Sequence, residues 1–248
     1  MKKVIFSLMF FCGLLGQAQS ISIEYNKKII NIDREDFNSE ADWVLEINDD
    51  ISLYRPVGKI RDTSWTKEFE VMGERYKAPS THYINYEVYH MDVNAKEKIT
   101  VHHFAGKDYM VKEPLEIMKW EITNETKKIK SYNCRLAISE KNGFPIEAWF
   151  TEEIPVSTNP NGLTGLPGLI LEYHLARSHL FVEEIDFDKE VNIKQPDWGT
   201  SISRAEYNKI VADQYKYPEG TTIIDTKNDD GSVSTRIIEV ESVKAKNE

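Results

Sequence analysis

The sequence predicts a mainly β protein, built as one curved antiparallel meander sheet, half-barrel-like in outline, with one C-terminal α-helix. Apolar and polar residues alternate along most of the chain, which is the period of a β-strand. The alternating runs are short and end in turn residues such as Asn, Asp and Gly, as in an antiparallel meander. Only one segment, close to the C-terminus, has the spacing of a helix.

The first half of the chain contains three expected strands and one irregular segment. Residues 21–25 and 43–47 alternate strictly, and residues 81–91 read THYINYEVYHM, with Tyr86 facing one side of the sheet. By contrast, residues 55–80 hold several prolines and glycines and show little periodicity. We therefore expect a long excursion or flap there.

The second half of the expected sheet begins with a hairpin. ITVHHF and YMVKEP flank the turn sequence Ala105-Gly106-Lys107-Asp108, so a hairpin is expected over 99–114. The remaining strands are expected at 118–123, 128–139 and 144–154, separated by turns at 124–126 and 141–143.

The one expected helix begins at Ser203–Glu206. This sequence has the spacing of a capping box, in which the serine and glutamate side chains satisfy each other's backbone N–H groups. Apolar residues then repeat on one helical face up to Tyr215, which predicts an amphipathic helix packed on the sheet. A last hairpin is expected to turn at 228–231, and the polar tail 244–248 is expected to fray.

The N-terminus has the features of a secretory signal peptide over residues 1–18. Two lysines precede an apolar run up to Leu15, and the small residues Gly16 and Ala18 fit a cleavage site. The rest of the chain, 19–248, is expected to form a single β-rich domain. The prediction is an exported protein, in the periplasm or associated with the outer membrane, with no membrane span.

The net charge argues against some classes of partner, and the cysteine count argues against an internal disulfide. The net charge is −10, and loss of two lysines with the signal peptide makes it −12 (−10 − 2). This excess of acid argues against nucleic acid as a partner. Cys134 is the single cysteine after residue 18, so no internal disulfide is expected. The sequence indicates no cofactor.

The stretch NPNGLTGLPGLILEYH, residues 159–174, is the most unusual part of the chain. We expect a structural loop that reverses at Asn161-Gly162, turns again with Gly168 at positive φ, and sets the register of a buried strand. Its glycines do not have the spacing of a nucleotide-binding loop. The residues expected to shape the loop are Pro160, Gly162, Gly165, Pro167 and Gly168.

The hexapeptide GLPGLI at 165–170 resembles the signature of the GLPGLI family, exported proteins of Bacteroidota. Three upstream segments support the resemblance in order: KWEI with Trp120, SYNCRLA with Cys134 and AWFT with Trp149. The match covers about residues 118–175. It implies an exported protein of unknown function and adds no catalytic chemistry.

Two sets of residues are candidates for binding. Tyr86, Trp120 and Trp149 could line a cavity for an apolar small molecule, although aromatic residues of this kind also form cores and rims. Thiol and imidazole groups suit copper or zinc, and a thiol also permits redox chemistry. The candidates for that second set are Cys134, His90 and His102, although no CxxC, HxxxH or HExxH spacing supports them.

No catalytic residue can be assigned from spacing. Glu152 and Glu153 are adjacent on an expected strand, so they point to opposite faces and cannot act as a pair. We therefore expect an exported envelope protein that is not an enzyme and that binds an apolar ligand or another envelope protein. One alternative is a metal-handling or thiol-redox periplasmic protein built on Cys134. Another is a hydrolase, whose catalytic residues would be scattered along the sequence and show no spacing motif.

Overall fold

The computed structural model describes residues 20–29, 39–58, 63–71, 74–82, 85–141, 143–214, 221–227 and 233–239. The predicted signal peptide, the turn at 228–231 and the tail at 244–248 lie outside these residues. Contacts divide the chain into two compact units, 1–202 and 203–248. The single domain over 19–248 stays a prediction.

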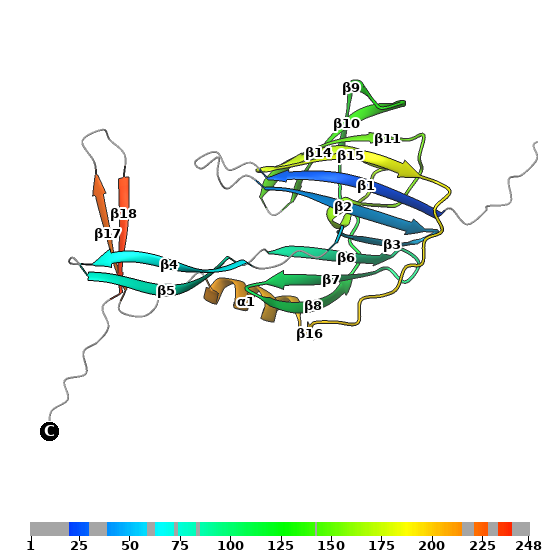
Figure 1. Cartoon of the computed structure of the whole chain (residues 1–248). Coiled ribbons are helices and arrows are strands. Elements are labelled where there is room, and N and C mark those ends of the chain that lie inside the picture. The colour runs from blue at the N-terminus through cyan, green and yellow to red at the C-terminus, as the bar shows by residue number, and fades with distance from the viewer. Residues whose placement is uncertain are drawn as a thin grey trace, which may run out of the picture. The chain divides into compact units, whose positions relative to one another are not determined.

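The first unit contains one open, curved sheet made of two antiparallel meanders (Figure 1). One meander is β1-β2-β3-β6-β7-β8, the other is β9-β10-β11-β14-β15, and β1 pairs with β15 to join them. At the edge, β16 pairs in parallel with β8. The strands of this sheet are β1 (Ser20–Ile29), β2 (Ser39–Asn48), β3 (Ile51–Pro56), β6 (Tyr86–Asp92), β7 (Glu97–Phe104), β8 (Lys107–Pro114), β9 (Glu121–Ile129), β10 (Tyr132–Lys141), β11 (Phe144–Thr151), β14 (Leu169–Leu175), β15 (Ser178–Asp186) and β16 (Thr200–Ser201).

The mainly β prediction is confirmed, and the N-terminal strand occupies the middle of the sheet. Ile23 and Tyr25 are fully buried, as the alternation in 21–25 predicts, because β1 has a strand on either side. A simple meander would have left β1 at an edge. Sequence periodicity does not specify which strands pair, so this arrangement could not be predicted.

The segment at 55–80, predicted as a long excursion or flap, contains a β-hairpin. β4 (Thr63–Val71) and β5 (Glu74–His82) pair antiparallel as a separate two-stranded sheet. Pro79 lies in β5, where a two-stranded sheet tolerates a missing N–H because each strand has one unpaired edge. The low periodicity of this segment did not indicate its two strands, and its role as an excursion or flap stays a prediction.

One predicted turn differs from the structure. β9 runs through 124–126, and the turn falls at Lys130, whose φ is 53°. This turn divides the single strand predicted over 128–139 into the ends of β9 and β10. The predicted hairpin over 99–114 is confirmed as β7 and β8, with positive φ at Ala105 and Gly106.

The second unit holds the predicted helix and the predicted last hairpin, β17 (Thr221–Lys227) and β18 (Val233–Glu239). α1 spans Arg204–Gln214 and begins with the expected capping box: the Ser203 N–H donates to Glu206 Oε2 at 2.8 Å, and the Glu206 N–H donates to Ser203 Oγ at 3.2 Å. No residue of α1 is buried, and its packing on the sheet stays a prediction. None of the described helices is long and apolar enough to cross a membrane.

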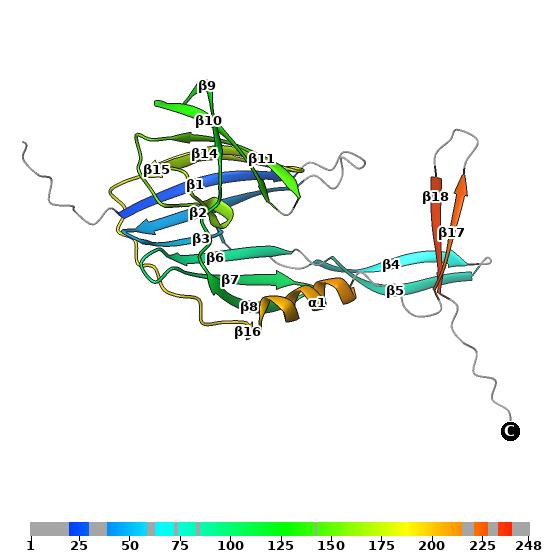
Figure 2. The same ribbon diagram turned by 180° about the vertical axis from the view of Figure 1, so that it is seen from behind.

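The main core lies on the inner face of the large sheet, under the segment that precedes β14. Ile154, Leu163 and Leu166 of this segment are buried in one cluster with Ile23 and Tyr25. Figure 2 shows the short turn η2 (Pro160–Gly162) lying against the sheet. Next to η2, β12 (Thr158–Asn159) and β13 (Leu163–Thr164) form a small ladder. This segment supports the functional site described next.

Candidate functional site

The glycine-rich loop is held by close backbone approaches. Asn161 and Gly162 have φ of 58° and 68°, which confirms the predicted reversal. The prediction for Gly168 is wrong, since Gly168 has no positive φ. Instead, a Cβ there would lie 1.9 Å from the Thr151 carbonyl oxygen. Gly165 combines both requirements, with φ of 89° and a Cβ position 2.2 Å from the Met118 oxygen.

Asn159 fixes the loop to the start of β14. Its side chain is fully buried; Oδ1 accepts the Ile170 N–H at 2.7 Å, and Nδ2 donates to the Gly168 oxygen at 3.2 Å. The side-chain amide of Asn159 therefore satisfies one backbone N–H and one backbone carbonyl group, as a neighbouring strand would. Leu166 is buried within the loop. Pro160 and Pro167 lie at the turns, and the role of the loop in setting the register of β14 stays a prediction.

Beside η2 the structure has an open cleft of about 610 Å³, which we name the Glu87 cleft. Its charged and amide groups come from separate elements: Glu87 from β6, Lys141 from the end of β10, Asn161 from η2 and Arg177 from the turn between β14 and β15. Lys141 Nζ donates to the backbone carbonyl oxygen of Asn161 at 2.7 Å, and the side-chain Nδ2 of Asn161 donates to Tyr173 Oη at 2.6 Å. The lining residues are Glu87, Tyr89, Lys141, Phe144, Asn161, Leu175, Ala176, Arg177 and Ser178.

Glu87 is held as an anion at the bottom of this cleft. His102 Nδ1 lies 2.7 Å from Glu87 Oε1, and Tyr89 Oη donates to Oε2. Burial opposes ionisation, but these two hydrogen bonds and the charges of His102 and Lys141 outweigh it and lower the Glu87 pKa to about 2. Although protein surrounds the carboxylate, 41% of the side-chain surface stays exposed, so a ligand can reach it.

The rim of the cleft adds an aromatic surface. Phe144 is 54% exposed at the start of β11. Behind the carboxylate, the rings of Tyr89 and Tyr54 are 6.4 Å apart, and Tyr54 stacks on Trp43 at 4.9 Å. A fixed anion, an amide and an exposed ring suit a ligand that carries both hydroxyl groups and apolar C–H faces.

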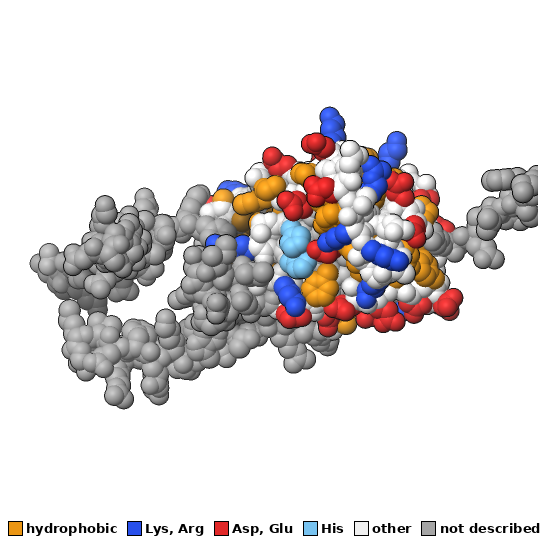
Figure 3. Space-filling model, turned by 90° about the horizontal axis from the view of Figure 1, so that it is seen from above, with side chains coloured by type: hydrophobic (Ala, Val, Ile, Leu, Met, Phe, Trp, Pro, Cys, Tyr) orange, Lys and Arg blue, Asp and Glu red, His pale blue; other side chains and the backbone are white. Residues whose placement is uncertain are grey.

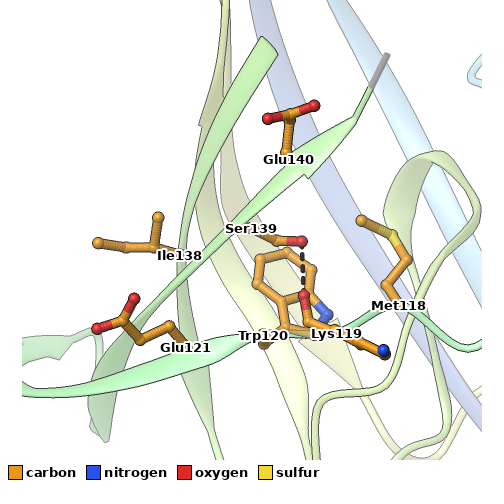
Figure 4. Close-up of a pocket in the computed structure, with 7 residues that line it drawn as sticks. All are labelled: Met118, Lys119, Trp120, Glu121, Ile138, Ser139 and Glu140. Atoms are coloured by element: carbon orange, nitrogen blue, oxygen red, sulfur yellow. Dashed lines mark hydrogen bonds between the residues drawn. The ribbon is translucent and has the colours of Figure 1, made fainter. Parts of the chain in front are cut away.

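A second groove, of about 530 Å³, lies on the other side of the loop, around Trp120 (Figure 4). Trp120 Nε1 donates to the Thr164 oxygen at 2.7 Å, and Ser139 Oγ donates to the Lys119 oxygen at 2.7 Å. These two polar atoms are engaged by the protein, whereas the charged side chains of Lys119, Glu121 and Glu140 also line the groove.

The three aromatic residues predicted to bind a ligand do not meet in one cavity. Among the described residues, Trp120 lines its own groove, whereas Tyr86 stacks on His103 with centroids 4.8 Å apart. Trp149 lies under Lys127, whose Nζ is 4.4 Å from the ring centroid. Their binding of a ligand stays a prediction.

The predicted metal ligands are also separated. His90 and His102 occupy opposite faces of the sheet, because His102 pairs across from Glu87, which is an odd number of residues away from His90 along β6. Cys134 is buried in the second meander, where burial raises its pKa to about 11 and keeps the thiol protonated. A protonated, buried thiol does not support the redox alternative.

Sequence reasoning missed Glu87 and Lys141. The available signal was the position of Glu87, which alternates with Tyr89 and Met91 and so had to face inward among apolar residues. A carboxylate placed there needs partners. Tyr89 lies on the same strand, but His102 and Lys141 come from β7 and β10, which are distant in sequence, so only the fold could identify these two partners.

Three comparisons relate this chain to known proteins. The profile of the N-glycanase peptide, N-terminal domain family matches residues 67–195, about half of the chain. None of the curated proteins matches. Two solved structures of PNGF-II, in different crystal forms, each match with a TM-score of 0.54 and 16% identity over 84% of this chain. The chain spans 35% of the length of those structures.

These matches correct several predictions. The family profile is that of the N-glycanase N-terminal domain, so the assignment to the GLPGLI family of unknown function is wrong. It also overturns the function expected from the sequence, a non-enzymatic binder of apolar ligands or envelope proteins, and its metal-handling or redox alternative. The match agrees with the predicted export of the protein.

Proposed function

The chain belongs to the N-glycanase peptide, N-terminal domain family, and we propose that it serves in the enzymatic removal of N-linked glycans from proteins. Its part in that reaction is to hold the glycosylated substrate in the Glu87 cleft. The family match supports the reaction class, and the exposed, ionised carboxylate of Glu87 carries the assignment of the cleft.

The chemistry of the cleft fits a sugar. A carboxylate accepts hydrogen bonds from hydroxyl groups, and its ionised form makes them stronger than neutral pairs. Lys141 and Asn161 extend the polar surface, and the exposed ring of Phe144 can contact the apolar face of a pyranose. A substrate with an N-linked glycan presents both kinds of surface next to a peptide.

Glu87 acts in binding, and proton transfer is a poor role for it. A general acid or base works best with a pKa near the operating pH. With a pKa of about 2, Glu87 holds no proton to donate at neutral pH and is a weak base. Hydrolysis by paired carboxylates would require a second acid, and Glu87 is the single carboxylate among the described residues that line the cleft.

Binding to a glycopeptide tests the proposal. A peptide with one N-linked glycan should bind more tightly than the same peptide without it, by calorimetry. Glu87→Gln and Phe144→Ala should each weaken glycopeptide binding about tenfold, or about 1.4 kcal/mol. Glu183→Gln and Phe187→Ala are matched controls, since both residues are exposed outside the cleft. Equal affinity for the two peptides would refute the assignment.

A second assay addresses the reaction itself. Incubation of the chain with a glycoprotein, followed by mass spectrometry, would detect released glycan. We expect release to depend on Glu87 through the Michaelis constant, with the turnover number changed little.

We also propose that the protein lies in the periplasm or at the outer membrane. Cell fractionation tests this location.

A further inference from the structure

The outer face of the same sheet carries a second polar cluster, separate from the Glu87 cleft. His174 on β14 and His179 on β15 are direct cross-strand partners, and their rings stack with centroids 4.1 Å apart and planes 12° apart. Glu172 precedes His174 by two residues and so shares its face. Figure 3 shows a patch of histidine side chains, in pale blue, on the face seen from above. We name Glu172, His174 and His179 the outer cluster.

The distances in this cluster are those of ligands around one ion. Glu172 Oε1 lies 3.2 Å from His174 Nε2 and 3.4 Å from His179 Nε2. In a tetrahedral zinc site with bonds of about 2.0–2.1 Å, neighbouring ligand atoms are about 3.3–3.4 Å apart. All three ligand atoms lie within 4.8 Å of one another. The two distances from Glu172 Oε1 to the histidine nitrogens therefore match the spacing of ligand atoms in a tetrahedral zinc site.

Neighbouring residues hold the carboxylate in place. Lys127 Nζ donates to Glu172 Oε2 at 2.7 Å and lies over the ring of Trp149. This contact occupies one carboxylate oxygen and leaves Oε1 directed at the histidines. A partner that orients a ligand in this way is typical of metal sites. The side chains of His174 and His179 are 48% and 30% exposed, while the His179 Nε2 atom itself is buried.

We propose that Glu172, His174 and His179 bind a divalent transition-metal cation, and that the ion is Zn²⁺. Two imidazoles and one carboxylate form a donor set that zinc accepts in proteins, with a fourth position left for water or a ligand. Hard cations such as Mg²⁺ prefer oxygen ligands and are not expected to compete. The site does not depend on the proposed N-glycanase function.

Calorimetric titration of the untagged, metal-free chain with Zn²⁺ tests this proposal. One Zn²⁺ should bind per chain, and His174→Gln and His179→Gln should each weaken binding at least about tenfold. His103→Gln is the control, because His103 also pairs with a carboxylate, Asp108 at 2.6 Å, on another hairpin. Titration with Co²⁺ should give the visible absorption of a tetrahedral site in the unmodified chain.

Several results would overturn the proposal. These are no saturable Zn²⁺ binding, unchanged affinity in both histidine variants, or an equal loss in His103→Gln. Glu172→Gln provides a second route, since it keeps the side-chain shape and removes the charge. If circular dichroism shows this variant folded and it still binds Zn²⁺ as the unmodified chain does, the outer cluster is not the site.

Discussion

The inner and outer faces of the sheet hold clusters of the same residue types with opposite exposure. In the Glu87 cleft, His102 is 3% exposed and the carboxylate is 41% exposed. In the outer cluster, Glu172 is 19% exposed, whereas His174 and His179 are 48% and 30% exposed. The inner cluster of Glu87, Tyr89 and His102 thus presents an anion to a ligand, and the outer cluster presents imidazole rings.

Both clusters also place a lysine over an aromatic ring. Lys141 Nζ is 5.3 Å from the Tyr89 ring centroid, and Lys127 Nζ is 4.4 Å from that of Trp149. The different exposure of the two clusters shows that residue types alone do not decide what a cluster binds. The member that faces solvent decides it: an exposed carboxylate suits hydroxyl donors, and exposed imidazoles suit a metal ion.

The largest expected effect concerns the loop that supports the inner face. Gly168→Val would place a Cβ 1.9 Å from the Thr151 oxygen, which is backbone and cannot move aside. We expect a loss of about 3 kcal/mol or more in the free energy of unfolding, measured by urea denaturation. Near-normal stability would show that the loop does not have this close approach.

The next largest expected effect is a difference between two histidines. Replacing His102 on the inner face should lower the free energy of unfolding much more than replacing His174 on the outer face. His102→Ala would leave a cavity and remove a hydrogen bond to a charged group, at a cost of about 2–4 kcal/mol. His174→Ala should change stability by less than about 0.5 kcal/mol, since its side chain is half-exposed. Equal losses in the two variants, measured by thermal denaturation, would contradict the contrast drawn between the clusters.

A pair of glycine variants tests the contact between η2 and the inner cluster. Gly162 and Gly143 have φ of 68° and 80°, so alanine strains both backbones similarly. A Cβ at Gly162 would lie 2.7 Å from the Tyr89 ring, whereas none of the described atoms lies within 4 Å of one at Gly143. Gly162→Ala should therefore cost about 1–2 kcal/mol more than Gly143→Ala, measured as a difference in chemical denaturation.

The smallest expected effect is a dependence of stability on pH. Folding lowers the Glu87 pKa from 4.5 to about 2, so the ionised carboxylate stabilises the fold fully above pH 4.5. This contribution decreases as the pH falls from 4.5 towards 2, because the unfolded state then binds the proton more readily. Partial exposure of Glu87 keeps the effect small. Glu87→Gln should show a shallower decrease in melting temperature over that range, and a parallel decrease would contradict this role.

Local sequence patterns predicted much of the fold. Alternation at 21–25 and 43–47 identified two central strands, and the spacing of Ser203 and Glu206 identified the start of α1. These features depend on neighbouring residues in the chain, so the sequence carries them directly. Gly168 shows the limit: a glycine in a turn suggested positive φ, whereas its true constraint is a carbonyl group contributed by β11.

The outer cluster left a signal that local spacing rules did not recognise. His174 and His179 are five residues apart, which matches no common helical metal motif. They lie equally far from the two-residue turn at Ala176-Arg177, and this symmetry makes them cross-strand partners. Once a turn is located, such pairs can be found from the sequence.

The sequence by itself determined the strand class of most segments, the capped helix and the glycine loop, because each depends on local backbone preferences and on the period of side-chain alternation. Tertiary structure decided that β1 pairs with β15 and joins two meanders, and that His102, Lys141 and Asn161 surround Glu87. It also decided which member of each cluster faces solvent. The physical reason is that pairing, burial and pKa depend on groups far apart in the chain, which only the folded sheet brings together.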